Sequence, residues 1–154
     1  MEIRELCWEE LQAASDILWK SFYEAEKHNT SMLGMERFRD LTSPVSLSMN
    51  TYDGSIVLYG GFSDGKMVAV GALKDENKIM MLYVHPSFWR KGYGTEMLAF
   101  LEDQIDSHEI HLNASDFGIR FYEHKGYRIL RKRREEEGLI FTEMVKFLRV
   151  ESNS

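Results

Sequence analysis

One stretch of the sequence, residues 79–105, limits the possible folds more than any other. The apolar run IMMLYV at 79–84 is typical of a buried strand, and after HPSFWRK two glycines, Gly92 and Gly94, lead into a helical pattern. EIHLN at 109–113 predicts a further strand. A strand, a helix and a strand in this order form a right-handed crossover, so we expect the two strands to be parallel neighbours in one sheet. One face of the helix would pack on the sheet through Met97, Leu98, Leu101 and Ile105, while Glu96, Glu102 and Asp103 would point outward.

The segments before this crossover predict an antiparallel meander. SIVLYGGF, KMVAVGAL and KIMMLYV are β-rich runs separated by SDG and KDEN, which have the composition of hairpin turns. Ahead of them we expect a short strand in MEIREL, an amphipathic helix over 8–27 whose apolar stripe includes Trp8, and a second helix over 31–41. After Pro44 the pattern leaves helical and irregular structure open.

The C-terminal third predicts one more helix and two strands. SDFGIRFYEHKG at 115–126 is typical of a helix capped by Ser115 or Asp116 and ended by Gly126. YRILRK and LIFTEMVKFL predict the last strands, joined by a solvated hairpin tip within the charged run 128–138. The order of elements predicts an α/β fold with a mixed, mostly antiparallel sheet of about seven strands and helices on both faces. We expect one domain over residues 1–150 and a short polar tail over 151–154.

Composition excludes several classes of function. A formal net charge of -6 disfavours a nucleic-acid-binding protein, which needs a basic face for phosphates. The acidic N-terminus lacks a long apolar run, and no apolar stretch approaches the roughly 18 residues of a membrane span, so we expect a cytoplasmic protein with no membrane segment. The single cysteine, Cys7, excludes an internal disulfide and a multi-cysteine metal site, and we expect no metal.

The turn that leads into the crossover helix predicts an anion site. The first N–H groups of a helix have no partner within the helix and carry partial positive charge. Glycine at 92 and 94 removes side chains that would keep a phosphate away, and Arg90 and Lys91 add charge beside it. A structural turn is equally compatible with a lone G-x-G. No G-K-[ST] closes the turn and the third glycine of a dinucleotide fingerprint is missing, so Walker and Rossmann sites are excluded.

Two segments resemble motifs of the GCN5-related N-acetyltransferase (GNAT) superfamily. The apolar strand, V-x-P, basic pair, G-x-G and Met/Leu helix are similar to motif A, whose loop consensus is [Q/R]-x-x-G-x-[G/A]; residues 90–94 match, while Trp89 stands where Gln or Arg is usual. LNASDFGIRFYEHKGY at 112–127 resembles motif B, with its FYE-x-x-G-[FY] helix. Both motifs stand in the family's order, and the order of elements extends the resemblance over nearly the whole chain.

The resemblance implies acetyl-CoA as co-substrate. In this family the fourth and fifth strands splay apart after a bulge in the fourth, and the pantetheine arm lies in the gap, which implies contacts at Leu82 and Val84. Asn113, at the end of the fifth strand, would bond the arm. The pyrophosphate would lie on the N–H groups of Arg90, Lys91, Gly92, Tyr93, Gly94 and Thr95.

The resemblance also implies a reaction, the transfer of an acetyl group to a primary amine of a small molecule or peptide by direct attack on the thioester. Tyr122 would protonate the departing thiolate, Phe121 would face the core, and an N–H near Val84 would stabilise the oxyanion. The base stays open, since KIMMLYV lacks the strand-four glutamate of some relatives. The conceivable bases are Glu24, His28, Asp40, Tyr83, His85 and His111.

Acceptor specificity is expected from the first two helices, their loop at 27–34 and the turn between the last two strands. The alternatives are a non-catalytic acyl-CoA-binding module of the same fold, or a glycine turn that binds another phosphate ligand. Many members of the superfamily are homodimers, which makes a homodimer an expectation here.

Overall fold

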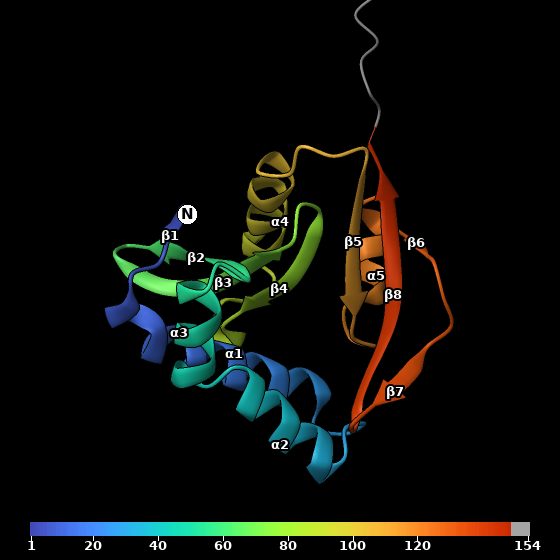
Figure 1. The fold of residues 1–154 in the computed structure, drawn as a ribbon, viewed down its shortest axis with the longest axis horizontal. Coiled ribbons are helices and arrows are strands. Elements are labelled where there is room, and N and C mark those ends of the chain that lie inside the picture. The colour runs from blue at the N-terminus through green and yellow to red at the C-terminus, as the bar shows by residue number, and fades with distance from the viewer. Residues whose placement is uncertain (149–154) are drawn as a thin grey trace, which may run out of the picture.

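A mixed sheet of eight strands organises the chain, and the computed structural model describes residues 1–148 of it (Figure 1). The predicted tail over 151–154 lies outside the described residues. The sheet order is β1-β2-β3-β4-β5-β8-β6, with β7 paired to β8; β4 and β5 are parallel, and the other pairs are antiparallel. The predicted meander, crossover and mixed α/β fold are therefore confirmed. The strands are β1 (Glu2–Glu5), β2 (Ile56–Ser63), β3 (Lys66–Lys74), β4 (Lys78–Val84), β5 (Glu109–Ala114), β6 (Arg128–Ile129), β7 (Arg134–Glu136) and β8 (Leu139–Phe147).

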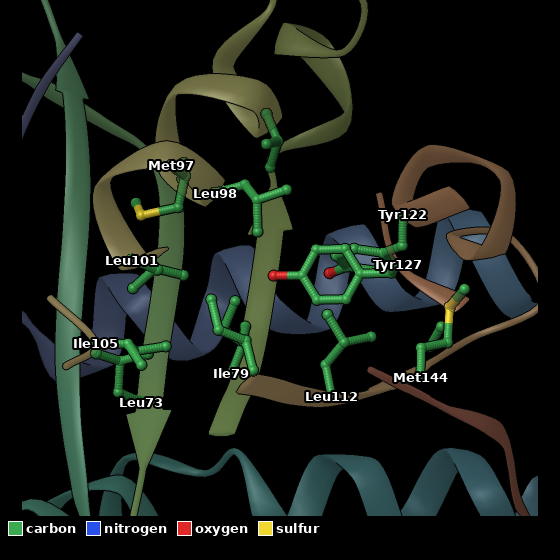
Figure 2. Close-up of a cluster of buried hydrophobic side chains, with 14 of the residues drawn as sticks. Leu73, Ile79, Met97, Leu98, Leu101, Ile105, Leu112, Tyr122, Tyr127 and Met144 are labelled. Carbon is green, nitrogen blue, oxygen red and sulfur yellow. The ribbon is translucent and has the colours of Figure 1, made fainter. Parts of the chain in front are cut away.

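Helices cover both faces of the sheet. On one face, α1 (Leu11–Glu26), α2 (Met32–Leu41) and α3 (Pro44–Tyr52) pack on β2–β4 through a cluster that includes Leu18, Leu47 and Leu58. On the other face lie α4 (Tyr93–Asp103) and α5 (Ile119–His124), with Met97 and Leu98 in a second cluster, part of which is drawn in Figure 2. Two short 3₁₀ turns, η1 (Trp8–Glu10) and η2 (Pro86–Phe88), complete the elements. Among residues 1–148 no helix is long and apolar enough to cross a membrane.

The stretch after Pro44, left open by the sequence pattern, forms a helix because its start is well capped. Ser43 is the N-cap, and its hydroxyl accepts a hydrogen bond from the N–H of Ser46 at 3.2 Å. Proline in the first turn loses no helical hydrogen bond, since the N–H groups there have no helical partner. Ser31 caps α2 in the same way through the N–H of Gly34, at 3.2 Å.

Two predicted helix starts are wrong. α1 begins only at Leu11, and Trp8 lies before it in η1. The Trp8 side chain is 77% exposed and does not belong to the apolar stripe of the helix. The N-cap of α5 is Gly118, and neither Ser115 nor Asp116 caps the helix. The carboxylate of Asp116 instead accepts hydrogen bonds from Arg133 and Asn29, which draws it away from the helix start.

Two predictions about charged side chains are also corrected. The charged run 128–138 was predicted to contain a hairpin tip, but residues 134–136 form the strand β7. The tight turn consists of Glu137 and Gly138, both at positive φ. Glu102, predicted to point outward, is part-buried, since its carboxylate accepts hydrogen bonds from Tyr127 Oη and Lys146 Nζ at 3.0 Å each.

The feature of the fold that positions the site is the early divergence of β4 and β5. These strands pair at only two positions, Lys78 with His111 and Ile79 with Leu112. The β3–β4 register shifts beside Met80, which has no partner in β3, and this irregularity bends β4 just where β5 departs. Figure 1 shows the two strands running apart beyond this point. The bulge and the splay expected from the family resemblance are both present.

Candidate active site

A cavity of about 430 Å³ fills the space opened between the diverging strands. We call it the cleft. Its walls are β4, the loop and helix start at 88–95, the end of β5, the segment 115–122 and the last turns of α1. It therefore brings together segments that lie up to about a hundred positions apart in the chain.

The edge of β4 that borders the cleft carries main-chain groups without strand partners. His85 N–H donates to Val68 O on β3 at 2.8 Å, and hydrogen-bonded pairs alternate along an antiparallel ladder. Tyr83 and Val70 are then the next bonded pair, while the main-chain groups of Leu82 and Val84 point away from β3. Since β5 has already departed, these groups face the cleft.

The turn at the start of α4 presents a row of free N–H groups. Within residues 1–148, none of the backbone N–H groups of residues 90–95 has an acceptor. Gly92 has φ of +84° and no atom within 4 Å of the position of a Cβ, and Arg90 also has positive φ. At Gly94 a Cβ would reach 3.8 Å from Phe121, at the cleft wall. Glycine at both positions keeps the approach to these N–H groups open.

Trp89, which departs from the motif A consensus, occupies a defined place beside the cleft. Its Nε1–H donates to Val84 O at 2.7 Å, so that carbonyl has a partner within the chain. Its ring packs against Phe117 from the β5–α5 segment, with centroids 5.1 Å apart. The two rings thus join the loops on either side of the gap, and the Val84 N–H and both main-chain groups of Leu82 stay free on this edge.

Two tyrosines reach the cleft from opposite faces of the sheet. Tyr83 on β4 packs with the α1–α3 cluster, and Tyr122 on α5 belongs to the α4–α5 cluster beside Tyr127 (Figure 2). Burial raises the pKa of the Tyr122 hydroxyl, and the Tyr83 hydroxyl raises it further. Both tyrosines line the cleft, so side chains from the two faces of the sheet reach the same cavity. Neither hydroxyl donates a hydrogen bond to an acceptor in the described part of the chain, and both remain protonated near neutral pH.

A second cavity, of about 280 Å³, continues the cleft on the α2 face of the sheet. It shares Met80, Tyr83 and Asn113 with the cleft, so the two meet across the splay. Its outer wall is formed by α2 and the β7–β8 hairpin, whose turn touches α2 where Gly138 O lies against Gly34. An Arg37–Glu137 salt bridge of 2.6 Å ties the same two elements together. The two cavities therefore form one connected space that reaches both faces of the sheet.

The sequence matches the profile of one known family over most of its length. A sequence profile described as Acetyltransferase (GNAT) domain matches residues 22–148. The chain belongs to the GNAT acetyltransferase family. No curated protein matches this GNAT protein in sequence.

Solved structures similar to this GNAT protein include several N-acetyltransferases. A GCN5-related N-acetyltransferase from Rhodopseudomonas palustris has a TM-score of 0.85 and 22% identity, covering 96% of this chain and 95% of its own. PaiA N-acetyltransferase from Thermoplasma acidophilum, in complex with coenzyme A, has a TM-score of 0.78 and 20% identity, covering 96% and 98%. The ribosomal-protein-S18-alanine N-acetyltransferase from Escherichia coli has a TM-score of 0.71 and 18% identity, covering 99% and 97%. At these identities the likeness shows the fold.

Most residues that the sequence predicted for the site line the cleft of this GNAT protein, though Lys91 is not in its lining. Asn113 is the first β5 residue beyond the pairing with β4, and it lines both cavities. Phe121, predicted to face the core, packs partly on it and also forms part of the cleft wall. Those in the lining are Leu82, Val84, Arg90, Gly92, Tyr93, Gly94, Thr95, Asn113 and Tyr122.

Of the conceivable bases, only Tyr83 lines either cavity. Glu24 is exposed and pairs with Lys27 at 3.2 Å, and His111 pairs with Glu109 at 3.0 Å. The ring of His85 accepts a hydrogen bond from Ser87 N–H, and burial, with Lys20 and Lys66 nearby, lowers the pKa of this imidazole.

Glu26 is the residue that the sequence reasoning missed. It is 4% exposed and lines the cleft from the last turn of α1. A signal was present, because Ala14, Leu18, Phe22 and Glu26 follow one another at four-residue steps along the buried stripe of the helix. A carboxylate that continues an apolar stripe is buried by the same geometry.

Proposed function

We propose that this GNAT protein is an acetyl-CoA-dependent N-acetyltransferase that acts on a primary amine. The observation that carries the proposal is the continuous cleft that runs from the free N–H groups of residues 90–95 to the Tyr122 hydroxyl. A diphosphate fits the first end, since unpartnered N–H groups at a helix start bind anions and Gly92 leaves the space open. The coenzyme A complex of a protein with this fold supports the assignment.

The pantetheine arm would run along β4 as an added strand. The free main-chain groups of Leu82 and the N–H of Val84 are available for it, and Asn113 faces it from β5. The Val84 carbonyl already accepts a hydrogen bond from Trp89 Nε1–H, so it is not free to accept one from the arm. The arm would then deliver the thioester to the part of the cleft lined by Tyr83 and Tyr122.

The chemistry would be direct attack of the amine nitrogen on the thioester carbon. Tyr122 would donate its proton to the departing sulfur, and its buried, protonated hydroxyl, which has no acceptor among the described residues, supports this role. The Val84 N–H is a candidate donor to the oxyanion. An alkyl ammonium of pKa about 10.4 must first lose a proton, which costs roughly 4 to 5 kcal/mol at pH 7 and calls for a base.

The acceptor would enter from the second cavity, opposite the cofactor. Proteins of this fold include a ribosomal-protein-S18-alanine N-acetyltransferase and an aminoglycoside 6'-N-acetyltransferase complexed with coenzyme A, so both peptide and small-molecule amines are candidates. The small volume of this cavity and the closed contact between α2 and the β7–β8 hairpin favour a small molecule or a narrow peptide end.

Release of free CoA thiol from acetyl-CoA, measured with a panel of small amines and peptide N-termini, tests the proposal. We expect amine-dependent thiol release and, in mass spectrometry, an acetylated amine. Tight acetyl-CoA binding without thiol release from any amine would favour a non-catalytic acyl-CoA-binding module. Competition by nucleotides that lack pantetheine, with no preference for acetyl-CoA, would favour a different phosphate ligand.

A further inference from the structure

Glu26 is a buried carboxylate whose negative charge has no cation beside it. The side chain accepts one hydrogen bond, from the backbone N–H of Phe117 at 3.3 Å, and forms no salt bridge within residues 1–148. A carboxylate has about four acceptor sites, so most of those of Glu26 remain open to a donor that enters the cleft.

The groups that face Glu26 come from three segments. Burial raises the pKa of the Tyr83 hydroxyl on β4, and the negative charge of the nearby Glu26 raises it further. Glu26 helps to raise the pKa of the Arg133 guanidinium, but this guanidinium donates its hydrogen bonds to Asp116, at 2.8–3.1 Å. Asp116 also accepts a hydrogen bond from Asn29, at 3.1 Å. Arg133 is thus paired with Asp116 and, within residues 1–148, forms no salt bridge with Glu26.

Glu26 also lies near the reacting centre. The cleft wall includes Glu26, Tyr83 and Tyr122, and Tyr83 interacts electrostatically with both of the others. An amine that enters from the second cavity would pass Tyr83, which lines both cavities, before it reaches the cleft, whose wall holds Glu26 and Tyr122.

We propose that Glu26 binds the ammonium group of the acceptor and takes its proton. This rests on the proposed acetyl transfer and narrows the substrate class to amines that arrive as cations. Anionic or neutral weakly basic amines would gain nothing from the carboxylate.

The proton balance of the step is complete. The ammonium N–H⁺ gives one proton to the Glu26 carboxylate, and the freed lone pair forms the bond to the thioester carbon. The C–S bond breaks, and Tyr122 gives a proton to the sulfur. The nitrogen loses its second proton as the amide forms, which restores the proton of Tyr122, and Glu26 releases its own proton to water.

The variant Glu26→Gln tests the proposal because the amide oxygen still accepts the Phe117 N–H, so a purely structural role is preserved. Asp16→Asn is the matched control, since it makes the same change at an exposed position of the same helix. Benzylamine, an ammonium at pH 7, and aniline, a neutral amine of similar size, are the probes within the wider amine panel.

We expect Glu26→Gln to lower kcat/KM for alkyl amines by about 100-fold or more, the usual size of a general-base contribution, and the rate with aniline by no more than a few-fold. With Gln the alkyl-amine rate should rise about tenfold per pH unit, following the neutral fraction of the amine, while the wild-type profile is flatter. Melting temperature and acetyl-CoA affinity should match those of Asp16→Asn.

Three results would overturn the inference. Equal losses with benzylamine and aniline would assign Glu26 a structural role, and an unchanged alkyl-amine rate would remove it from the reaction while leaving the transferase activity in place. A wild-type protein that acetylates no amine in the panel would refute the proposed function, and this inference with it.

Discussion

A single methyl group at Gly92 should separate the cofactor role of the turn from its role in the fold. Gly92 has φ of +84°, and a Cβ there would meet no atom within 4 Å, so Gly92→Ala introduces backbone strain without a clash. A non-glycine residue in this conformation costs about 1–2 kcal/mol. For a domain of this size that lowers Tm by about 2–4 °C for each kcal/mol.

The turn between β2 and β3 supplies the control. Gly65 has φ of +77° and equally open space, but it is absent from the lining of both cavities. Gly65→Ala should therefore cost the same stability. Only Gly92→Ala places a methyl group beside the N–H groups of residues 90–95. Loss of one hydrogen bond to a charged phosphate, worth about 1.5–3 kcal/mol, would weaken coenzyme A binding by about 10- to 100-fold.

Thermal melting and titration calorimetry with coenzyme A measure the two effects separately. We expect similar Tm values for the two variants and a weaker Kd for Gly92→Ala alone. If both bind coenzyme A as the wild type does, the diphosphate does not dock on this turn, and the reasoning from free N–H groups fails.

Three further predictions concern single side chains. Tyr122→Phe should lower kcat by about 100-fold with unchanged coenzyme A affinity, and equal turnover would remove the hydroxyl from the mechanism. Gly34→Ala should lower the free energy of unfolding by about 1–3 kcal/mol in denaturant titrations, because the methyl group meets Gly138 O; wild-type stability would show that α2 and the hairpin separate easily. Arg4 holds the pKa of Glu10 at about 2, below its ordinary 4.5, so the Tm advantage of wild type over Glu10→Gln should be full above pH 4.5 and vanish as pH falls through 2. A gap in Tm that does not change with pH would contradict this.

The parts of the fold that the sequence predicted well are those with a strong local period. The meander follows from alternating β-rich runs with short polar turns, and the crossover from an apolar strand, a glycine turn and the stripe of Met97, Leu98 and Leu101. The helix start predicted at Asp116 was wrong for a reason outside the local sequence. The Asp116 carboxylate accepts hydrogen bonds from Arg133, 17 positions away, instead of from the N–H groups of the helix start. Such long-range competition leaves no local pattern.

The site divides in the same way. The residues predicted for the cofactor side, apart from Lys91, come together in the cleft lining, because motifs A and B concentrate them in two short segments. The base was sought among residue types that stand out by their neighbours, such as His28 and His85, whereas the only local sign of the proposed base, Glu26, is that it continues the apolar stripe of α1. Its hydrogen bond from Phe117 N–H and its place in the cleft wall depend on segments far away in the sequence.

The two-position pairing of β4 with β5 gives the molecule an internal seam. Few backbone hydrogen bonds cross between the two halves of the sheet, so their relative orientation depends on side-chain packing, on the contact of α2 with the β7–β8 hairpin and on the connection through α4. In the proposed reaction, a pantetheine arm bound between β4 and β5 would link the two halves of the sheet. The protein would then be more rigid with the arm bound than without it.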